Sequence, residues 1–145
     1  MAEYSNSAEQ TIAVGNNALF TNEPSPCTKG LIIHRDDSGI FTVRGVVNNA
    51  CANYARYVVD FGSNIAIPET GGTVAPISVG LAIDGEVLPS STMIVTPAAV
   101  GEYFNVHRSM EIAVPRGCCY VIAIENTSTQ SILMSNANIR IVRTA

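Results

Sequence analysis

The sequence predicts an all-β protein, a single antiparallel β-sandwich of about nine to eleven short strands. Apolar and polar residues alternate with a period of two, which is the spacing of side chains on a half-buried strand. Clusters of Gly, Pro, Asn and Asp interrupt this alternation every eight to twelve residues, a spacing typical of sandwiches and barrels. Helical periodicity is absent except at residues 96–100. There Thr96 suits an N-cap, Pro97 suits the first helical position and Gly101 follows, so a turn or two of helix is predicted.

The predicted strands run from residue 31 to the C-terminus. The first two, residues 31–35 and 40–44, flank Asp36-Asp37-Ser38-Gly39, whose residue types suit a hairpin turn. Further strands are predicted at residues 57–61, 77–83, 110–114, 120–124 and 138–143.

The 145 residues fit one domain, because no internal repeat or flexible linker divides them. Residues 11–145 carry the strand pattern and are expected to form this domain. Residues 1–10 are too polar for a core and are expected to form an N-terminal arm. The part of this arm that would contact an assembly partner is Met1, Ala2, Glu3 and Tyr4.

The composition favours assembly. Apolar residues make up 47% of the chain and charged residues only 14%, well below the typical quarter. Ser, Thr, Asn and Gly must therefore cover much of the surface. Because interface centres are also depleted in charge, we favour a permanent assembly over a monomer with a neutral polar surface.

The net charge excludes one class of partner. A charge of −4 and an isoelectric point near 5.0 disfavour nucleic acid, which requires a basic patch. No apolar run approaches the roughly 18 residues that span a bilayer, so no membrane partner is expected. The first residues lack the apolar segment of a secretory signal, and we expect synthesis in a cytoplasm without secretion.

Two predicted strands, residues 77–83 and 120–124, carry small or apolar residues on the second face in place of a row of polar side chains. An antiparallel strand that is half exposed should carry them, so a long loop or a neighbouring subunit is expected to cover these faces. The second-face residues are Ser78, Gly80, Ala82, Val121 and Ala123. Aromatic residues are enriched in interfaces, and the candidate subunit contacts are Tyr57, Tyr103, Phe104, Tyr120 and Ile122.

No residue set predicts catalysis. A serine hydrolase commonly exposes its nucleophile in Gly-x-Ser-x-Gly, and this motif is missing. His34 and His107 each stand beside an arginine in a predicted strand, where solvent-facing positions explain them. Two isolated histidines do not supply the clustered ligands of a metalloenzyme. We therefore expect a non-enzymatic protein with no catalytic residue, no metal site and no cofactor.

The four cysteines form no C-x-x-C motif, which disfavours a zinc site. Cys118 and Cys119 are adjacent, so on a strand they would point to opposite faces, and we expect buried thiols that act as small hydrophobic residues. A Cys27–Cys51 disulfide stays open. Asp36 and Asp37 could hold calcium through their oxygens, but adjacent aspartates in a tight turn more often form the turn itself.

Several segments resemble one known family. They are IPETGGTVAPISV at residues 67–79, AIDGEVLP at 82–89, VTPAAV at 95–100, YFNV at 103–106, VPRGCC at 114–119 and ENTS at 125–128. The series is similar to a family of small proteins and C-terminal domains from Firmicutes and their prophages. Domains of that family resemble the jelly roll of tumour necrosis factor and the globular heads of complement-like proteins.

The resemblance implies a homotrimer built around a three-fold axis. Some relatives carry the domain behind collagen repeats on spore or cell surfaces, but no collagen tract precedes this domain in the sequence. The resemblance therefore implies a structural protein of a phage virion, a capsid decoration or a fibre head, whose partners are itself and a major capsid or fibre protein. The alternatives are a filament tip on a spore or cell surface and a module that binds a glycan or receptor.

Overall fold

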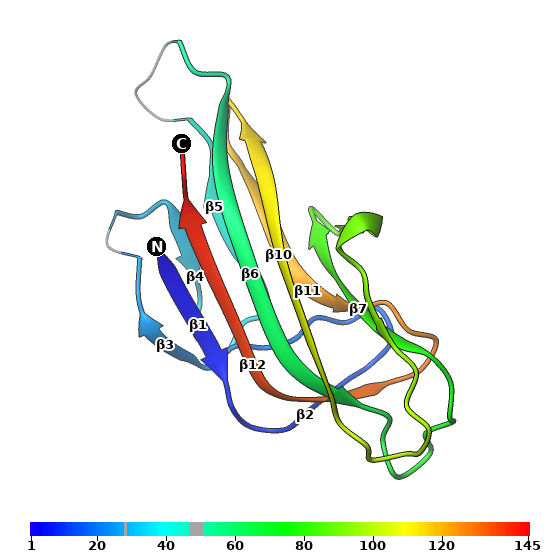
Figure 1. Cartoon of the computed structure of the whole chain (residues 1–145). Helices are drawn as coiled ribbons and strands as arrows, with labels where there is room; N and C mark the ends of the chain where they lie inside the picture. The colour runs from blue at the N-terminus through cyan, green and yellow to red at the C-terminus, as the bar shows by residue number, and fades with distance from the viewer. Residues whose placement is uncertain (28, 47–50) are drawn as a thin grey trace.

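The computed structural model describes residues 1–27, 29–46 and 51–145, and it confirms the β-sandwich. Two antiparallel sheets of six strands each lie face to face (Figure 1). The first sheet contains β1 (Ala2–Asn6), β2 (Gln10–Ile12), β3 (Asn22–Ser25), β6 (Tyr54–Ala66), β10 (Phe104–Pro115) and β12 (Ile132–Arg143). The second contains β4 (Ile32–His34), β5 (Phe41–Arg44), β7 (Ile77–Ile83), β8 (Glu86–Val87), β9 (Met93–Val95) and β11 (Cys119–Asn126).

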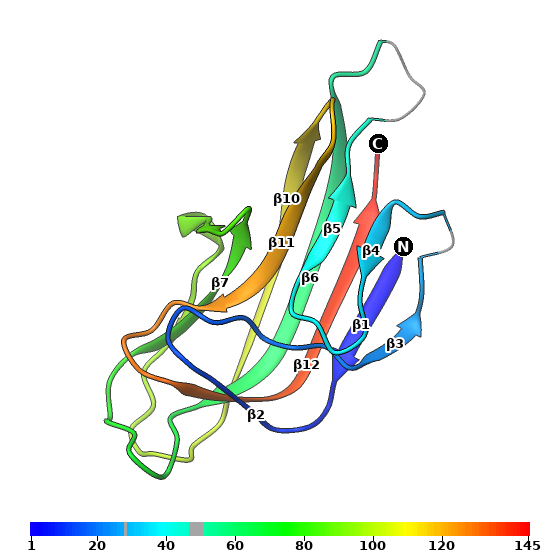
Figure 2. The ribbon, with the colours of Figure 1, turned by 180° about the vertical axis from the view of Figure 1, so that it is seen from behind.

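The order of strands in each sheet differs from their order in the sequence. The first sheet runs β10-β6-β12-β1-β3, with β2 paired to β12. The second runs β4-β5-β11-β7-β8, with β9 paired to β7, and Figure 2 shows it from outside with β11 between β5 and β7. The described residues thus form twelve strands, slightly more than predicted, because several short edge strands carry no clear alternation.

The core lies between the two sheets and follows the period-two pattern. Every second residue of β6 from Ala55 to Phe61 is fully buried, and the same holds for Ile77, Val79 and Leu81 on β7. Burying a large apolar side chain contributes about 1.5–3 kcal/mol. The alternation of apolar residues therefore determines which face of each long strand points toward the core.

The N-terminal residues are a strand and not a free arm. Ala2 lies opposite Ile141 and Tyr4 opposite Ile139 in the ladder between β1 and β12, and both Ala2 and Tyr4 are fully buried. Residues 10–12 form β2 of the same sheet. The predicted boundary between residues 10 and 11 is therefore wrong. Alternation of only two apolar residues was enough for a strand that pairs on both sides.

The predicted hairpin is confirmed. β4 and β5 pair in antiparallel register with Ile32 opposite Val43, and the turn contains Asp37 at a φ of 61°. His34 is half-buried rather than solvent-facing, because its ring stacks on Phe41 at 4.5 Å and lies 4.7 Å from that of Tyr4. Its Nε2 also hydrogen-bonds the carbonyl of Ser38 at 2.9 Å. The histidine therefore packs against two aromatic side chains of the core.

The predicted helix at residues 96–100 does not form. In the described residues the only helical segment is a short 3₁₀ turn, Pro89–Ser91. A segment of five residues cannot repay the cost of helix nucleation by itself. The chain instead turns at Gly101, whose N–H donates to the carbonyl of Ile67 at 2.8 Å.

The second face of β7 is covered by the chain itself. A Cβ placed on Gly80 would meet Val87 at 3.0 Å, Ser91 at 3.4 Å and Thr127 at 3.6 Å. Ala82 and Ala123 are only 3% and 5% exposed. The loop alternative therefore accounts for most of this face without a neighbouring subunit. No helix in the described part of the chain is long and apolar enough to cross a membrane.

Candidate functional site

A surface hollow of about 400 Å³ lies where β10 begins, and we name it the Tyr103 hollow. Its lining comes from segments that are far apart in the sequence. The lining residues are Glu9, Thr11, Pro68, Glu69, Thr70, Gly101, Tyr103 and Leu133. Figures 1 and 2 show the segment after β6 and the segment before β10 side by side at the lower end of the sandwich, which brings residues 68–70 next to Gly101.

Gly101 allows one wall of the hollow to form. Its φ of +74° is a conformation that side chains with a Cβ rarely adopt. A Cβ at this position would also lie 2.6 Å from Oε1 of Glu69. The absence of a side chain therefore lets the Glu69 carboxylate lie against the backbone before β10.

Tyr103 is fixed in the hollow by its hydroxyl. The hydroxyl donates a hydrogen bond to Oε2 of Glu9 at 2.5 Å, although the two residues are 94 positions apart. Burial raises the pKa of Tyr103 to about 12, and the hydrogen bond and negative charge of Glu9 act in the same direction. The side chain is still 38% exposed. The hollow therefore presents a neutral, oriented aromatic ring to solvent.

A row of side-chain amides continues from the hollow across the outer face of the first sheet. Nδ2 of Asn105 donates to Oδ1 of Asn64 at 3.2 Å, and Nδ2 of Asn64 donates to Oδ1 of Asn136 at 3.4 Å. Ser135, opposite Asn64 in the ladder, interacts with the Tyr103 hydroxyl. Hydrogen-bond donors and acceptors thus lie next to the aromatic ring of Tyr103.

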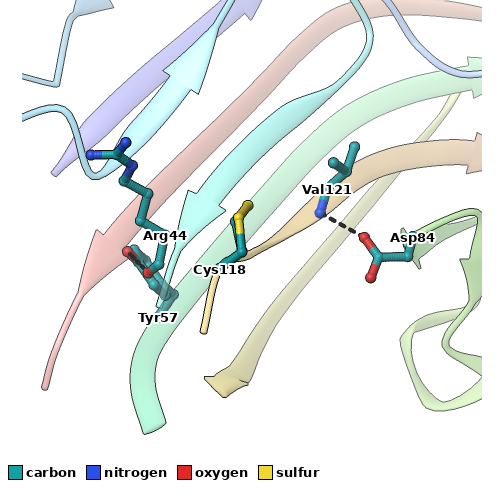
Figure 3. The surroundings of a disulfide bond; sticks show 6 residues. Arg44, Tyr57, Asp84, Cys118 and Val121 are labelled. Carbon is teal, nitrogen blue, oxygen red and sulfur yellow. Dashed lines mark hydrogen bonds between the residues drawn. A yellow bond between two sulfur atoms is a disulfide. The ribbon is translucent and has the colours of Figure 1, made fainter. Parts of the chain in front are cut away.

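A second hollow, of about 420 Å³, lies beside β11, and we name it the Tyr120 hollow. Its lining is mostly apolar: Ile83, Asp84, Glu86, Val87, Leu88, Pro89 and Tyr120. The carboxylate of Asp84 is occupied, since Oδ1 accepts the N–H of Val121 at 2.9 Å (Figure 3). Fewer polar groups are therefore available to a ligand here than in the Tyr103 hollow.

The five predicted contact residues do not lie together. Tyr103 and Tyr120 line the two hollows, and Phe104 is half-buried at the start of β10. Tyr57 and Ile122 are fully buried in the core, so the prediction that they lie at a subunit contact is wrong. The Tyr57 hydroxyl donates to the carbonyl of Arg44 at 2.6 Å, and burial raises its pKa. Alternation cannot distinguish a core aromatic from one at a surface.

The cysteines differ from both expectations. Cys118 and Cys119 form a disulfide (Figure 3), whereas Cys27 carries a free thiol, so no Cys27–Cys51 bridge exists. The expectation of two separate thiols assumed that both residues lie in a strand. Cys118 lies in the turn before β11 instead, where the opposite-face rule does not apply.

Among the described residues, no three His, Cys, Asp or Glu side chains are placed to hold a metal ion. His34 belongs to β4 of the second sheet and His107 to β10 of the first. Sequence reasoning missed Glu9, Glu69 and Leu133 as site residues. Each has an ordinary local context, and only the fold brings them to Tyr103.

No family model and no curated protein matches the sequence. Similar solved structures include the CBM22-1 xylan-binding domain of Paenibacillus barcinonensis Xyn10C, with 12% identity, a TM-score of 0.36 and coverage of 99% of this chain and 87% of that one. The CBM22-1–GH10 modules of Clostridium thermocellum xylanase 10B, complexed with xylohexaose, give 12% identity and a TM-score of 0.38. The GH26–CBM35 β-(1,4)-mannanase of Podospora anserina has 12% identity to this chain and a TM-score of 0.32.

The last two likenesses cover 99% and 97% of this chain but only 26% and 28% of those proteins. Identities and TM-scores of this size assign the chain to no family. The candidate function therefore rests on the hollow itself.

Proposed function

We propose that the chain is a non-catalytic module that binds a carbohydrate in the Tyr103 hollow. The observation that carries this proposal is an oriented, partly exposed tyrosine in a hollow that two carboxylates, Glu9 and Glu69, also line. A volume of about 400 Å³ is within the usual range for small-ligand sites. Tyr103 is partly exposed, so part of the residue is accessible to a ligand from solvent.

The chemistry of the lining matches a sugar better than other small ligands. Sugar hydroxyls donate hydrogen bonds, and the hollow offers the carboxylates of Glu9 and Glu69 and the hydroxyls of Thr11 and Thr70 as acceptors. The C–H face of a pyranose packs on an aromatic ring, which combines apolar area with a polar edge. The two carboxylates and the net charge of −4 disfavour an anionic glycan.

The proposal is tested by affinity electrophoresis and thermal melting against soluble xylan, mannan and β-glucan. At least one neutral polysaccharide is expected to retard the native chain and raise its melting temperature, because a ligand that binds only the folded state stabilises it. Tyr103→Ala should abolish both effects. Tyr54→Ala is the matched control, since Tyr54 is 55% exposed but lies at the opposite end of β6.

Two outcomes contradict carbohydrate binding at this site. One is that no polysaccharide in the panel affects migration or melting. The other is that Tyr103→Ala binds as tightly as the native chain while Tyr54→Ala does not.

A second candidate function is self-association, in line with the homotrimer implied by the sequence resemblance. It is supported by β10, which has twelve residues and pairs only with β6 among the described strands. A long unpaired edge invites another strand or subunit, and a closed cyclic assembly would cover it without forming fibres. In this proposal the trimer is a virion component that contacts a major capsid or fibre protein, or else a spore- or cell-surface component.

Light scattering separates the two states. A trimer predicts about three times the chain mass of 15.3 kDa across a range of concentrations. A mass of one chain at every concentration contradicts the trimer but leaves carbohydrate binding intact. The two proposals therefore fail independently.

A further inference from the structure

The turn between β10 and β11 contains a disulfide between consecutive residues. Cys118 and Cys119 have Cα atoms 3.7 Å apart, and their sulfurs are bonded. Cys118 is exposed in the turn, whereas Cys119 is half-buried and is the first residue of β11. Figure 3 shows the bond where β11 begins, beside the end of β5.

This disulfide contributes little to the stability of the fold. A disulfide stabilises a protein mainly by closing a loop in the unfolded chain, and the effect grows with the number of residues enclosed. A bond between neighbours encloses no other residue. It joins no two distant segments either, so its effect must be local to the turn.

The local effect is to determine where β11 begins. Successive side chains of a strand point to opposite faces, so two adjacent cysteines in regular strand conformation cannot bond. The disulfide therefore keeps Cys118 outside the strand. Because Cys119 lies opposite Arg44 in the ladder between β11 and β5, the next pair would be Cys118 and Gly45.

Half of that next pair already exists. The N–H of Gly45 donates to the carbonyl of Cys118 at 2.8 Å. In an antiparallel hydrogen-bonded pair the two residues exchange both backbone bonds, so the Cys118 N–H would donate to the carbonyl of Gly45. That carbonyl accepts Nη1 of Arg143 at 3.2 Å. Reduction of the disulfide thus removes the constraint that prevents the hydrogen bond from the Cys118 N–H to the Gly45 carbonyl.

We propose that Cys118 and Cys119 form a reversible redox modification site that reacts with small dithiols and disulfides, and that reduction extends β11 to include Cys118. A thiolate of the dithiol attacks one sulfur, which forms a mixed disulfide and releases the other cysteine as a thiolate that takes up a proton. The second thiol of the reagent then displaces the first cysteine. The pair gains two electrons and two protons, and the reagent leaves as its disulfide.

The environment determines which state is present. A reducing cytosol keeps thiols reduced, whereas oxidising compartments favour disulfides. Because Cys118 is an exposed residue, a reagent is expected to reach the disulfide without unfolding of the chain. In a reducing environment β11 therefore includes Cys118, and in an oxidising environment β11 begins at Cys119.

The first test is alkylation of the native, full chain with iodoacetamide, followed by mass spectrometry. Cys118 and Cys119 should resist alkylation until dithiothreitol is added and should then both react, with the chain still folded by circular dichroism. Cys27 is an internal control for the reagent. Burial raises its pKa, but backbone N–H groups of Lys29, Ile32 and Leu31 outweigh this and lower the pKa overall. Alkylation of both cysteines before any reductant, or only after unfolding, overturns the proposal.

The second test is hydrogen–deuterium exchange of the oxidised and reduced chains. Reduction should slow exchange of the Cys118 amide and leave β7 unchanged. Cys118→Ser should show the reduced pattern without reductant and no response to it, whereas Cys27→Ser should respond like the native chain. Identical exchange at residues 116–120 in the two redox states overturns the extension of β11.

Discussion

The two ends of β10 are built in opposite ways. At its start, the Tyr103 hollow draws its walls from four separate segments, and the bond between Glu9 and Tyr103 joins residues 94 positions apart. At its end, the turn contains a disulfide between neighbouring residues, Cys118 and Cys119. The hollow therefore draws on distant segments of the fold, whereas the disulfide joins two consecutive residues.

This difference shows where function can be expected to depend on folding. A ligand site made of distant segments forms only when the sheets have assembled, so substitutions remote in sequence should affect it. The disulfide itself needs only two consecutive residues, although the turn around it also forms backbone hydrogen bonds with Gly45 and Asn53. Substitutions at each end of β10, with matched controls elsewhere in the chain, test this difference.

The largest effect is expected from Gly45→Ala at the turn end. A Cβ at Gly45 would lie 2.4 Å from the carbonyl oxygen of Pro115 and 2.9 Å from that of Cys118. Both atoms are backbone and cannot move aside, so the loss of unfolding free energy should be about 3 kcal/mol by urea denaturation. Gly62→Ala is the control, because its Cβ would meet only ordinary contacts at 3.5 Å and beyond. Equal losses for the two variants contradict the close approach.

An intermediate effect is expected from Gly101→Ala at the hollow end. The variant suffers backbone strain at a φ of +74° and a clash with Glu69, whose flexible side chain can partly yield. We expect a loss of about 2 kcal/mol. Gly71→Ala has a similar φ of +78° but no atom within 4 Å, and should lose about 1 kcal/mol. The difference between the stability losses of the two variants, measured by urea denaturation, isolates the contact with Glu69. Equal losses would mean that the wall of the hollow is not packed against Gly101.

A smaller effect is expected from Tyr103→Phe at high pH. The pKa of Tyr103 is raised to about 12 in the fold from 10.0. The folded state therefore retains a proton that the unfolded state loses, and stability falls as the pH rises from 10 toward 12. Without this hydroxyl the decline should be shallower. Some decline should remain, because burial also raises the pKa of Tyr4 to about 12. Parallel stability curves for both proteins between pH 9 and 11.5 would contradict the hydrogen bond from Tyr103 to Glu9.

The smallest effect is expected from Cys118→Ser. A loop this short removes little entropy from the unfolded chain, so the loss should be about 1 kcal/mol or less, against about 3 kcal/mol for a loop of fifteen residues. Urea denaturation of the oxidised native chain and the variant measures this difference. A loss of unfolding free energy as large as that of Gly45→Ala would contradict this account, because the disulfide would then stabilise the whole fold.

Alternation located the long strands but underestimated the lengths of β6, β10 and β12. The expected strand at residues 77–83 coincides with β7, and the hairpin around Asp37 formed as its residue types indicated. The method failed where few apolar residues suffice, as in β1, whose only buried apolar side chains are Ala2 and Tyr4. It also assumed regular strand at Cys118, where the chain turns.

The candidate site was predictable only in part. Tyr103 was selected because aromatic residues are enriched in interfaces, and it does line a hollow. Its partners Glu9 and Glu69 carry no local signal, since acidic residues in loops are ordinary. Pairing of distant segments by the fold determined which of them meet the tyrosine, and no spacing rule in one sequence contains that information.

The most direct test of carbohydrate binding is a ¹⁵N chemical-shift titration of the native chain with an oligosaccharide of the polysaccharide that it retains best. The account predicts the largest shifts at the amides of Gly101, Tyr103 and their neighbours at residues 68–70, with little change at residues 83–89. Shifts concentrated around Tyr120 and residues 83–89, or no shifts with any neutral oligosaccharide, would contradict it.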